Sequence, residues 1–135
     1  MNQLHEICRK FELLSVYLFG SRADEGLRLL QGEPVSARGS DLDVGVFFVL
    51  RDPDVDRLGE LQIALEEIFD PLRVDLVPLD HVDPLFQFRA IDGHRIATTD
   101  STATDERELE VMRRAADLLP FQRQAELETF GVATS

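Results

Sequence analysis

Two aspartates separated by one residue begin the longest strand-like segment of the sequence. Asp41 and Asp43 open the stretch 41–50, whose second half is apolar. Side chains alternate along a strand, so residues two apart project from one face with their Cα atoms ~6.5–7 Å apart. Two carboxylates at that spacing can share one or two hard cations. Further Asp-x-Asp pairs occur at 52–56, but a solvated, proline-containing turn before a helix is a sufficient explanation for them.

A third aspartate lies inside another short apolar segment. Asp75 belongs to Val74-Asp75-Leu76-Val77, where a charge is costly unless it is paired or bound to a metal. If this segment neighbours the first pair, each like-charge contact at ~4 Å costs on the order of 4 kcal/mol at an effective dielectric constant of about 20. Such a cluster must bind protons or a divalent cation, and oxygen ligands favour Mg²⁺ or Mn²⁺ over Zn²⁺. The alternative is that Asp75 pairs with Arg73 or Arg89.

A glycine and a serine follow the first apolar segment of the chain. Gly20-Ser21 comes directly after Ser15–Phe19 and before a predicted helix. The glycine lets backbone approach a ligand closely, and the helix presents free N–H groups to an anion such as phosphate. The alternative is an ordinary helix start, in which Ser21 is the N-cap and Asp24 the acid of a capping box.

Hydrophobic periodicity predicts the elements that must position these residues. Helices are predicted at 3–14, from Ser21 to about residue 31, at 55–68, at 80–91, and at about 105–127 with Thr104 as cap and an interruption at Pro120. Strands are predicted at 15–19, 41–50, 73–77 and 94–98, and a loop at 32–40. Alternating strands and helices predict a small α/β sheet with helices packed against it, in a single domain spanning 1–135.

Composition narrows the possible functions. The 135 residues include 14 Lys+Arg and 26 Asp+Glu, a formal net charge of −12. A field of this sign repels nucleic acid, so any phosphate must be bound locally by a metal ion or a helix N-terminus. The single cysteine, Cys8, excludes an internal disulfide and a cysteine-based zinc site. With no transmembrane-length apolar stretch and no signal-peptide pattern, we expect a cytoplasmic protein that binds neither nucleic acid nor membrane.

Three motifs together resemble the minimal nucleotidyltransferases of the polymerase-β-like superfamily. They are Leu18-Phe19-Gly20-Ser21-Arg22, Gly39-Ser40-Asp41-Leu42-Asp43-Val44 and Val74-Asp75-Leu76-Val77. The resemblance implies a small mixed β-sheet flanked by helices. Residues 88–96 and 116–121 are similar to segments of MntA-type antitoxins, which are paired with HEPN-domain toxins.

The spacer between the first two motifs departs from the family pattern. Usually about ten residues separate the serine from the first aspartate, whereas here residues 22–40 intervene. Because the spacer ends again in a family-like Gly39-Ser40-Asp41, we expect the extra residues to bulge outward between two preserved ends. Displacement of the Gly20-Ser21 turn would instead weaken nucleotide binding.

The resemblance also implies roles for individual residues. Asp41, Asp43 and Asp75 would hold Mg²⁺ or Mn²⁺, and Asp75 would help to deprotonate the acceptor. Gly20 and Ser21 would hold the β- and γ-phosphates of ATP. AMP would then be transferred to a hydroxyl group, which in an MntA-like antitoxin is a tyrosine of the HEPN toxin.

Several alternatives remain open from the sequence. The chain could be a nucleotidyltransferase that modifies a small molecule such as an antibiotic, or a non-catalytic antitoxin that acts by occluding its partner. Arg22 could contact phosphate or belong to the plain surface. The final helix could dock a partner or only pack on the sheet.

Overall fold

The computed structural model describes residues 2–51 and 55–130, and the turn predicted at 52–54 lies outside them. Four strands form one sheet in the order β3-β2-β1-β4. The strands are β1 (Leu13–Phe19), β2 (Leu42–Phe48), β3 (Val74–Pro78) and β4 (His94–Thr98). Strand β1 is antiparallel to β2 and β4, whereas β2 and β3 are parallel. The predicted small mixed sheet is therefore confirmed.

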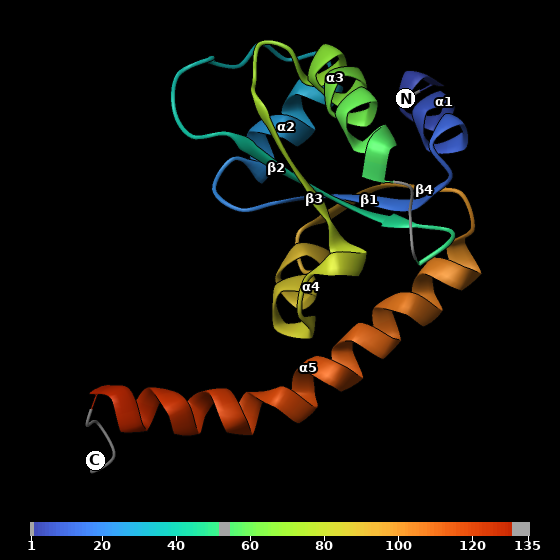
Figure 1. The fold of residues 1–135 in the computed structure, drawn as a ribbon. Coiled ribbons are helices and arrows are strands. Elements are labelled where there is room, and N and C mark those ends of the chain that lie inside the picture. The colour runs from blue at the N-terminus through green and yellow to red at the C-terminus, as the bar shows by residue number, and fades with distance from the viewer. Residues whose placement is uncertain (1, 52–54, 131–135) are drawn as a thin grey trace.

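Helices cover both faces of the sheet (Figure 1). One face carries α1 (Asn2–Lys10), α2 (Ala23–Leu30) and α3 (Leu58–Phe69), and the other carries α4 (Pro84–Ile91) and α5 (Ser101–Phe130). Short 3₁₀ turns lie at Val55–Arg57 and Leu79–His81. None of the described helices is long and apolar enough to cross a bilayer.

Each face of the sheet buries its own apolar cluster. Successive side chains of β1 point to opposite faces, so this strand contributes residues to both clusters. Val16 and Leu18 point to the cluster under α1, α2 and α3. Tyr17 and Phe19 point to the smaller cluster under α4 and α5. Every residue of β1 is buried, as expected for a central strand with helices on both sides.

Several predicted element boundaries are wrong. The first helix ends at Lys10 rather than residue 14, because Glu12 has a positive φ of 54° and turns the chain into β1. Ser21 does not cap α2, which starts at Ala23 without a side-chain cap. The predicted 80–91 helix divides into a 3₁₀ turn and α4, which Asp83 caps by accepting a hydrogen bond from the backbone of Phe86.

The last helix also differs from its prediction. Helix α5 begins at Ser101, about four residues earlier than expected, and the Asp100 carboxylate caps it by accepting a 3.0 Å bond from the Ala103 N–H. Thr104 lies inside the helix, where its hydroxyl hydrogen-bonds to that of Thr98 at 2.7 Å. Pro120 does not end the helix, which bends along its length and continues to Phe130 (Figure 1).

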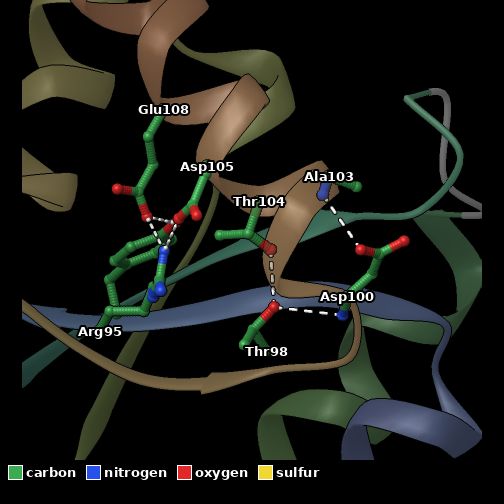
Figure 2. Close-up of polar contacts among 8 residues, drawn as sticks. Arg95, Thr98, Asp100, Ala103, Thr104, Asp105 and Glu108 are labelled. Carbon is green, nitrogen blue, oxygen red and sulfur yellow. Dashed lines mark hydrogen bonds and ion pairs between the residues drawn. The ribbon is translucent and has the colours of Figure 1, made fainter.

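Polar contacts attach the first turns of α5 to the sheet (Figure 2). Arg95 of β4 reaches Asp105 at 2.8 Å and Glu108 at 3.0 Å. The buried Tyr17 donates its hydroxyl proton to Glu108 at 2.6 Å. Further along α5, Arg107 forms a 3.1 Å ion pair with Asp80, and both side chains are at least nine-tenths buried. These contacts fix α5 over the face that also carries Asp43.

Candidate active site

Asp43 and Asp75 are neighbours across the parallel strands β2 and β3. Their Cα atoms are direct register partners, and paired residues of adjacent strands project to the same face of a sheet. Burial is the largest cause that raises the pKa of Asp43 above its ordinary value, followed by the charge of Asp75 and a hydrogen bond between the two carboxyl groups. The sheet thus brings together two of the three predicted carboxylates.

Gly20 leaves the space that the Asp43 carboxylate occupies. Its φ is +76°, and a Cβ atom at this position would collide with Asp43 Oδ2. Phe19, the preceding residue, is the register partner of Asp43 on β1. An L side chain is therefore excluded twice, by conformation and by space. The predicted glycine turn and the predicted aspartate lie side by side.

Asp41 lies just before β2, because the strand begins at Leu42 rather than at the predicted Asp41. It is exposed, and its charge raises the pKa of Asp43. Among the residues that the structure describes, no three acidic, histidine or cysteine side chains are close enough together to form a metal-binding group. In the described part of the chain, Asp41 therefore acts on Asp43 through its charge and does not complete a three-residue metal-binding group.

Arginine does not neutralise Asp75. No ion pair joins Asp75 to Arg73 or Arg89 in the described part of the chain, so this alternative is not supported. Arg89 of α4 instead lies over the ring of Phe86, 5.7 Å from its centroid, and its charge lowers the pKa of Asp43. Sequence reasoning gave Arg89 no place beside Asp43, because the packing of α4 could not be derived from periodicity.

Ser21 projects toward the end of the spacer. Its hydroxyl lies 3.0 Å from the hydroxyl of Ser40, the residue before Asp41, and both residues are exposed. The Ser21 hydroxyl makes no cap bond to α2, so Ser40 is the hydrogen-bond partner that a ligand at this exposed turn would displace. The start of α2 adds backbone N–H groups, which favour an anion.

Arg22 has a role that the sequence did not reveal. It is buried, with 5% of its side chain exposed, so the plain-surface alternative is wrong. Its guanidinium donates to the backbone carbonyls of Ser36 and Ser40 at 2.6 and 3.2 Å, and pairs with Glu25 at 2.6 Å. The three-residue spacing from Arg22 to Glu25 was the available signal.

The donors at this site fit a hard cation. Asp43, Asp75 and Asp41 offer only carboxylate oxygens, which Mg²⁺ and Mn²⁺ prefer. Burial and the neighbouring charges of Asp75 and Asp41 raise the pKa of Asp43, and a cation bound there would offset the repulsion between these carboxylates. Cys8 is buried, and burial raises the pKa of its thiol to about 11, so it supplies no ligand.

Known proteins share this fold. Residues 2–102 match the family described as "Polymerase beta, Nucleotidyltransferase". No curated protein matches the chain significantly. One similar solved structure is of a toxin–antitoxin MntA-HpeT mutant (21% identity, TM-score 0.66, 95% of each chain covered).

Two further solved structures share the fold. One is a toxin–antitoxin with AMP-PNP, at 22% identity and a TM-score of 0.64, with 95% of each chain covered. The other is a tri-AMPylated Shewanella oneidensis HEPN toxin in complex with MNT antitoxin, at 20% identity and a TM-score of 0.62, covering 95% of this chain and 92% of that one. With its family match over residues 2–102, this chain belongs to the polymerase β nucleotidyltransferase family.

Proposed function

We propose that this chain is a Mg²⁺-dependent adenylyltransferase that moves AMP from ATP to a tyrosine hydroxyl of a HEPN-domain toxin. The observation that carries the proposal is the Asp43–Asp75 carboxyl pair against the Gly20 turn. The fold shared with a toxin–antitoxin holding AMP-PNP and with a complex of a tri-AMPylated HEPN toxin supports the nucleotide and the partner. The expected compartment is the cytoplasm, and the donor is a nucleoside triphosphate rather than nucleic acid.

The carboxylates would hold the cation and receive a proton. Asp41 and Asp43 would be the principal Mg²⁺ ligands, with Asp75 completing the set. When bound, the metal would neutralise phosphate charge and orient the reacting oxygens. The acceptor oxygen attacks the α-phosphorus, the bond from that phosphorus to the bridging oxygen of pyrophosphate breaks, and the acceptor proton passes to Asp75.

The Gly20-Ser21 turn would hold the remaining phosphates. Gly20 lets the β- and γ-phosphates approach the backbone, and the exposed Ser21 hydroxyl donates a hydrogen bond to them. A protein with a net charge of −12 otherwise repels a triphosphate. The local donors and the cation therefore decide whether ATP binds.

Helix α5 would dock the toxin. Apolar side chains that are 43–56% exposed lie along it at helical spacing, at Leu109, Met112 and Leu119. Exposed apolar residues in a stripe are typical of protein interfaces. Met112→Glu should abolish a complex with the toxin on size-exclusion chromatography while leaving the melting temperature unchanged. An intact complex would place the interface elsewhere.

The transfer can be tested directly. The protein is incubated with Mg²⁺ and the product of any adjacent HEPN-encoding gene, in parallel with α-³²P-ATP and γ-³²P-ATP. Label from the α-position alone on a toxin tyrosine is the expected result, because AMP transfer releases the γ-phosphate. The double variant Asp41→Asn/Asp43→Asn should transfer nothing, whereas Glu67→Gln, an exposed change on α3, serves as control.

Three outcomes contradict the proposal in different ways. Label from γ-³²P-ATP would mean phosphorylation. Label on an aminoglycoside but not on protein would mean a small-molecule transferase. Protection of cells from the toxin by Asp41→Asn/Asp43→Asn, without any transfer by the wild type, would mean inhibition by occlusion.

A further inference from the structure

We propose that Arg22 is a positioning residue that locks the end of the long spacer and thereby places Asp41 at the site. This inference rests on the proposed function for its catalytic consequence. Among the described residues, Arg22 makes no hydrogen bond or ion pair with Asp41, Asp43 or Asp75. It acts on the backbone that carries Asp41.

The guanidinium group joins two points of the spacer to helix α2. Nη2 donates to the Ser36 carbonyl at 2.6 Å, and Nη1 donates to the Ser40 carbonyl at 3.2 Å. Nε and Nη2 also contact the two carboxylate oxygens of Glu25 at 3.1 and 2.6 Å. One buried side chain therefore holds a helix and both ends of the segment 36–40 in one arrangement.

The spacer is shaped to receive this side chain. Gly39 has a φ of +118°, and a Cβ atom there would lie 3.3 Å from Arg22 Nη1. Ser21 adds a second link to Ser40 through their hydroxyl groups. Two consecutive residues, Ser21 and Arg22, therefore hydrogen-bond to Ser40, the residue immediately before Asp41.

Asp41 depends on these contacts more than its two neighbours do. Asp43 and Asp75 are register partners in the sheet, so backbone hydrogen bonds set their positions. Asp41 lies outside β2, between Ser40 and Leu42, whose N–H donates to the Arg73 carbonyl at 2.8 Å. The strand holds Asp41 on one side, and the Arg22 contacts hold it on the other.

Only arginine fits this position. The guanidinium plane offers five donors in a fixed geometry, and here it serves Glu25 and two carbonyl oxygens at once. Lysine keeps the charge but presents a compact ammonium group that cannot span the same acceptors. Arg22→Lys is therefore the informative substitution, because it preserves the positive charge and removes the planar set of N–H donors.

The first measurement needs no catalysis. Trypsin cleaves after arginine, and Arg38 is exposed within the held segment. Arg22→Lys should raise the rate of cleavage after Arg38 by about tenfold, because local opening of the spacer exposes that bond. The control Arg28→Lys, an exposed change on α2, leaves the Arg38 site intact and should be cleaved after Arg38 at the wild-type rate. An unchanged rate in Arg22→Lys overturns the proposed lock.

The second measurement tests the link to Asp41. Arg22→Lys should lower the kcat for AMP transfer by about tenfold or more with little change in the KM for ATP, because the ligand is misplaced and not lost. In a double variant with Asp41→Asn, Arg22→Lys should cause no further loss of kcat. In a double variant with Asp75→Asn, the two separate losses of kcat should multiply. Equal multiplication in both pairs overturns the assignment to Asp41.

Two further arms keep the outcomes separate. If Arg22→Lys fails to fold, Glu25→Gln decides, because this half-buried partner can change without removing the guanidinium. It should show the same faster cleavage in a smaller degree, and wild-type cleavage overturns the proposal. If the wild type transfers no AMP, the proposed function fails, and the trypsin rates still decide the lock.

Discussion

Asp43→Asn should make the protein more stable and inactive. Asparagine keeps the size of the side chain and removes the charge that burial, Asp75 and Asp41 disfavour. A like-charge contact at ~4 Å costs about 1 kcal/mol in water and about 4 kcal/mol at an effective dielectric constant of 20. Asp75 is exposed and Asp43 is half-buried, so solvent screening places the gain near the lower figure, about 1 kcal/mol.

The gain should depend on pH with a defined sign. The folded-state pKa of Asp43 is raised, so ionisation of this group destabilises the fold as pH rises through that pKa. Asp43→Asn removes the penalty at neutral pH. Below the unfolded pKa of about 3.9, Asp43 carries a proton in both states and the difference disappears. The advantage of the variant should therefore shrink as the pH falls from the raised folded-state pKa of Asp43 toward the unfolded value of about 3.9.

Magnesium should reverse the order of stability. A cation that binds only the folded wild type at ten times its Kd stabilises it by about 1.4 kcal/mol, which exceeds the gain of the variant. Melting temperatures with EDTA and with Mg²⁺ measure both effects, and 1 kcal/mol corresponds to roughly 3–5 °C for a domain of this size. Asp117→Asn, exposed on α5, is the control and should respond to neither pH nor Mg²⁺ in this way.

Either of two results would refute this reasoning. A variant that is less stable than the wild type near neutral pH in EDTA would show that the Asp43 charge is compensated in the fold. An equal response of Asp43→Asn and wild type to Mg²⁺ would show that Asp43 is not a ligand. AMP transfer by the variant at the wild-type rate would contradict its catalytic role independently.

Three other changes test the packing around the site. Gly20→Ala should abolish AMP transfer and lower the melting temperature by more than Gly32→Ala, which has a similar positive φ but no neighbour within 4 Å; equal losses would contradict the steric argument. Arg107→Met should cost about 3 kcal/mol in urea unfolding near neutral pH, because it leaves Asp80 buried and unpaired, and less at acid pH, where Asp80 is protonated. The thiol of Cys8, with a pKa near 11 and 1% exposure, should react with a disulfide reagent only as fast as the protein opens; rapid reaction of the native protein would contradict its burial.

The sequence contained enough information to place the strands and two of the carboxylates. The predicted segments match all four strands to within two residues at each end, and β2 stops two residues early, before the exposed Val49 and Leu50. The single-residue spacing between Asp41 and Asp43 predicted side chains on one face. The meeting of Asp43 with Asp75 followed only once β2 and β3 were parallel neighbours, a pairing that periodicity alone does not specify.

The boundaries and side-chain contacts were beyond sequence reasoning for physical reasons. A residue such as Glu12 ends a helix through a backbone conformation that its type does not require. Pro120 stays within α5, although proline removes one backbone hydrogen bond and usually kinks or breaks a helix. Arginine is usually found on the protein surface. Arg22 is buried because the backbone carbonyls of Ser36 and Ser40, fourteen and eighteen positions away, accept its hydrogen bonds.

Strand pairing positions Asp43 and Asp75, whereas we infer that the Arg22 contacts position Asp41. This division explains how the site tolerates a long spacer. Doubling the length of a flexible loop adds only about 0.6 kcal/mol of closure entropy, so a spacer of residues 22–40 is inexpensive for the fold. The extra length does leave the position of Asp41 less well fixed relative to the Gly20-Ser21 turn. The Arg22 contacts with Ser36 and Ser40 restore that connection locally. Shortening the loop before Ser36 should therefore preserve the site, whereas lengthening it between Ser36 and Asp41 should impair it.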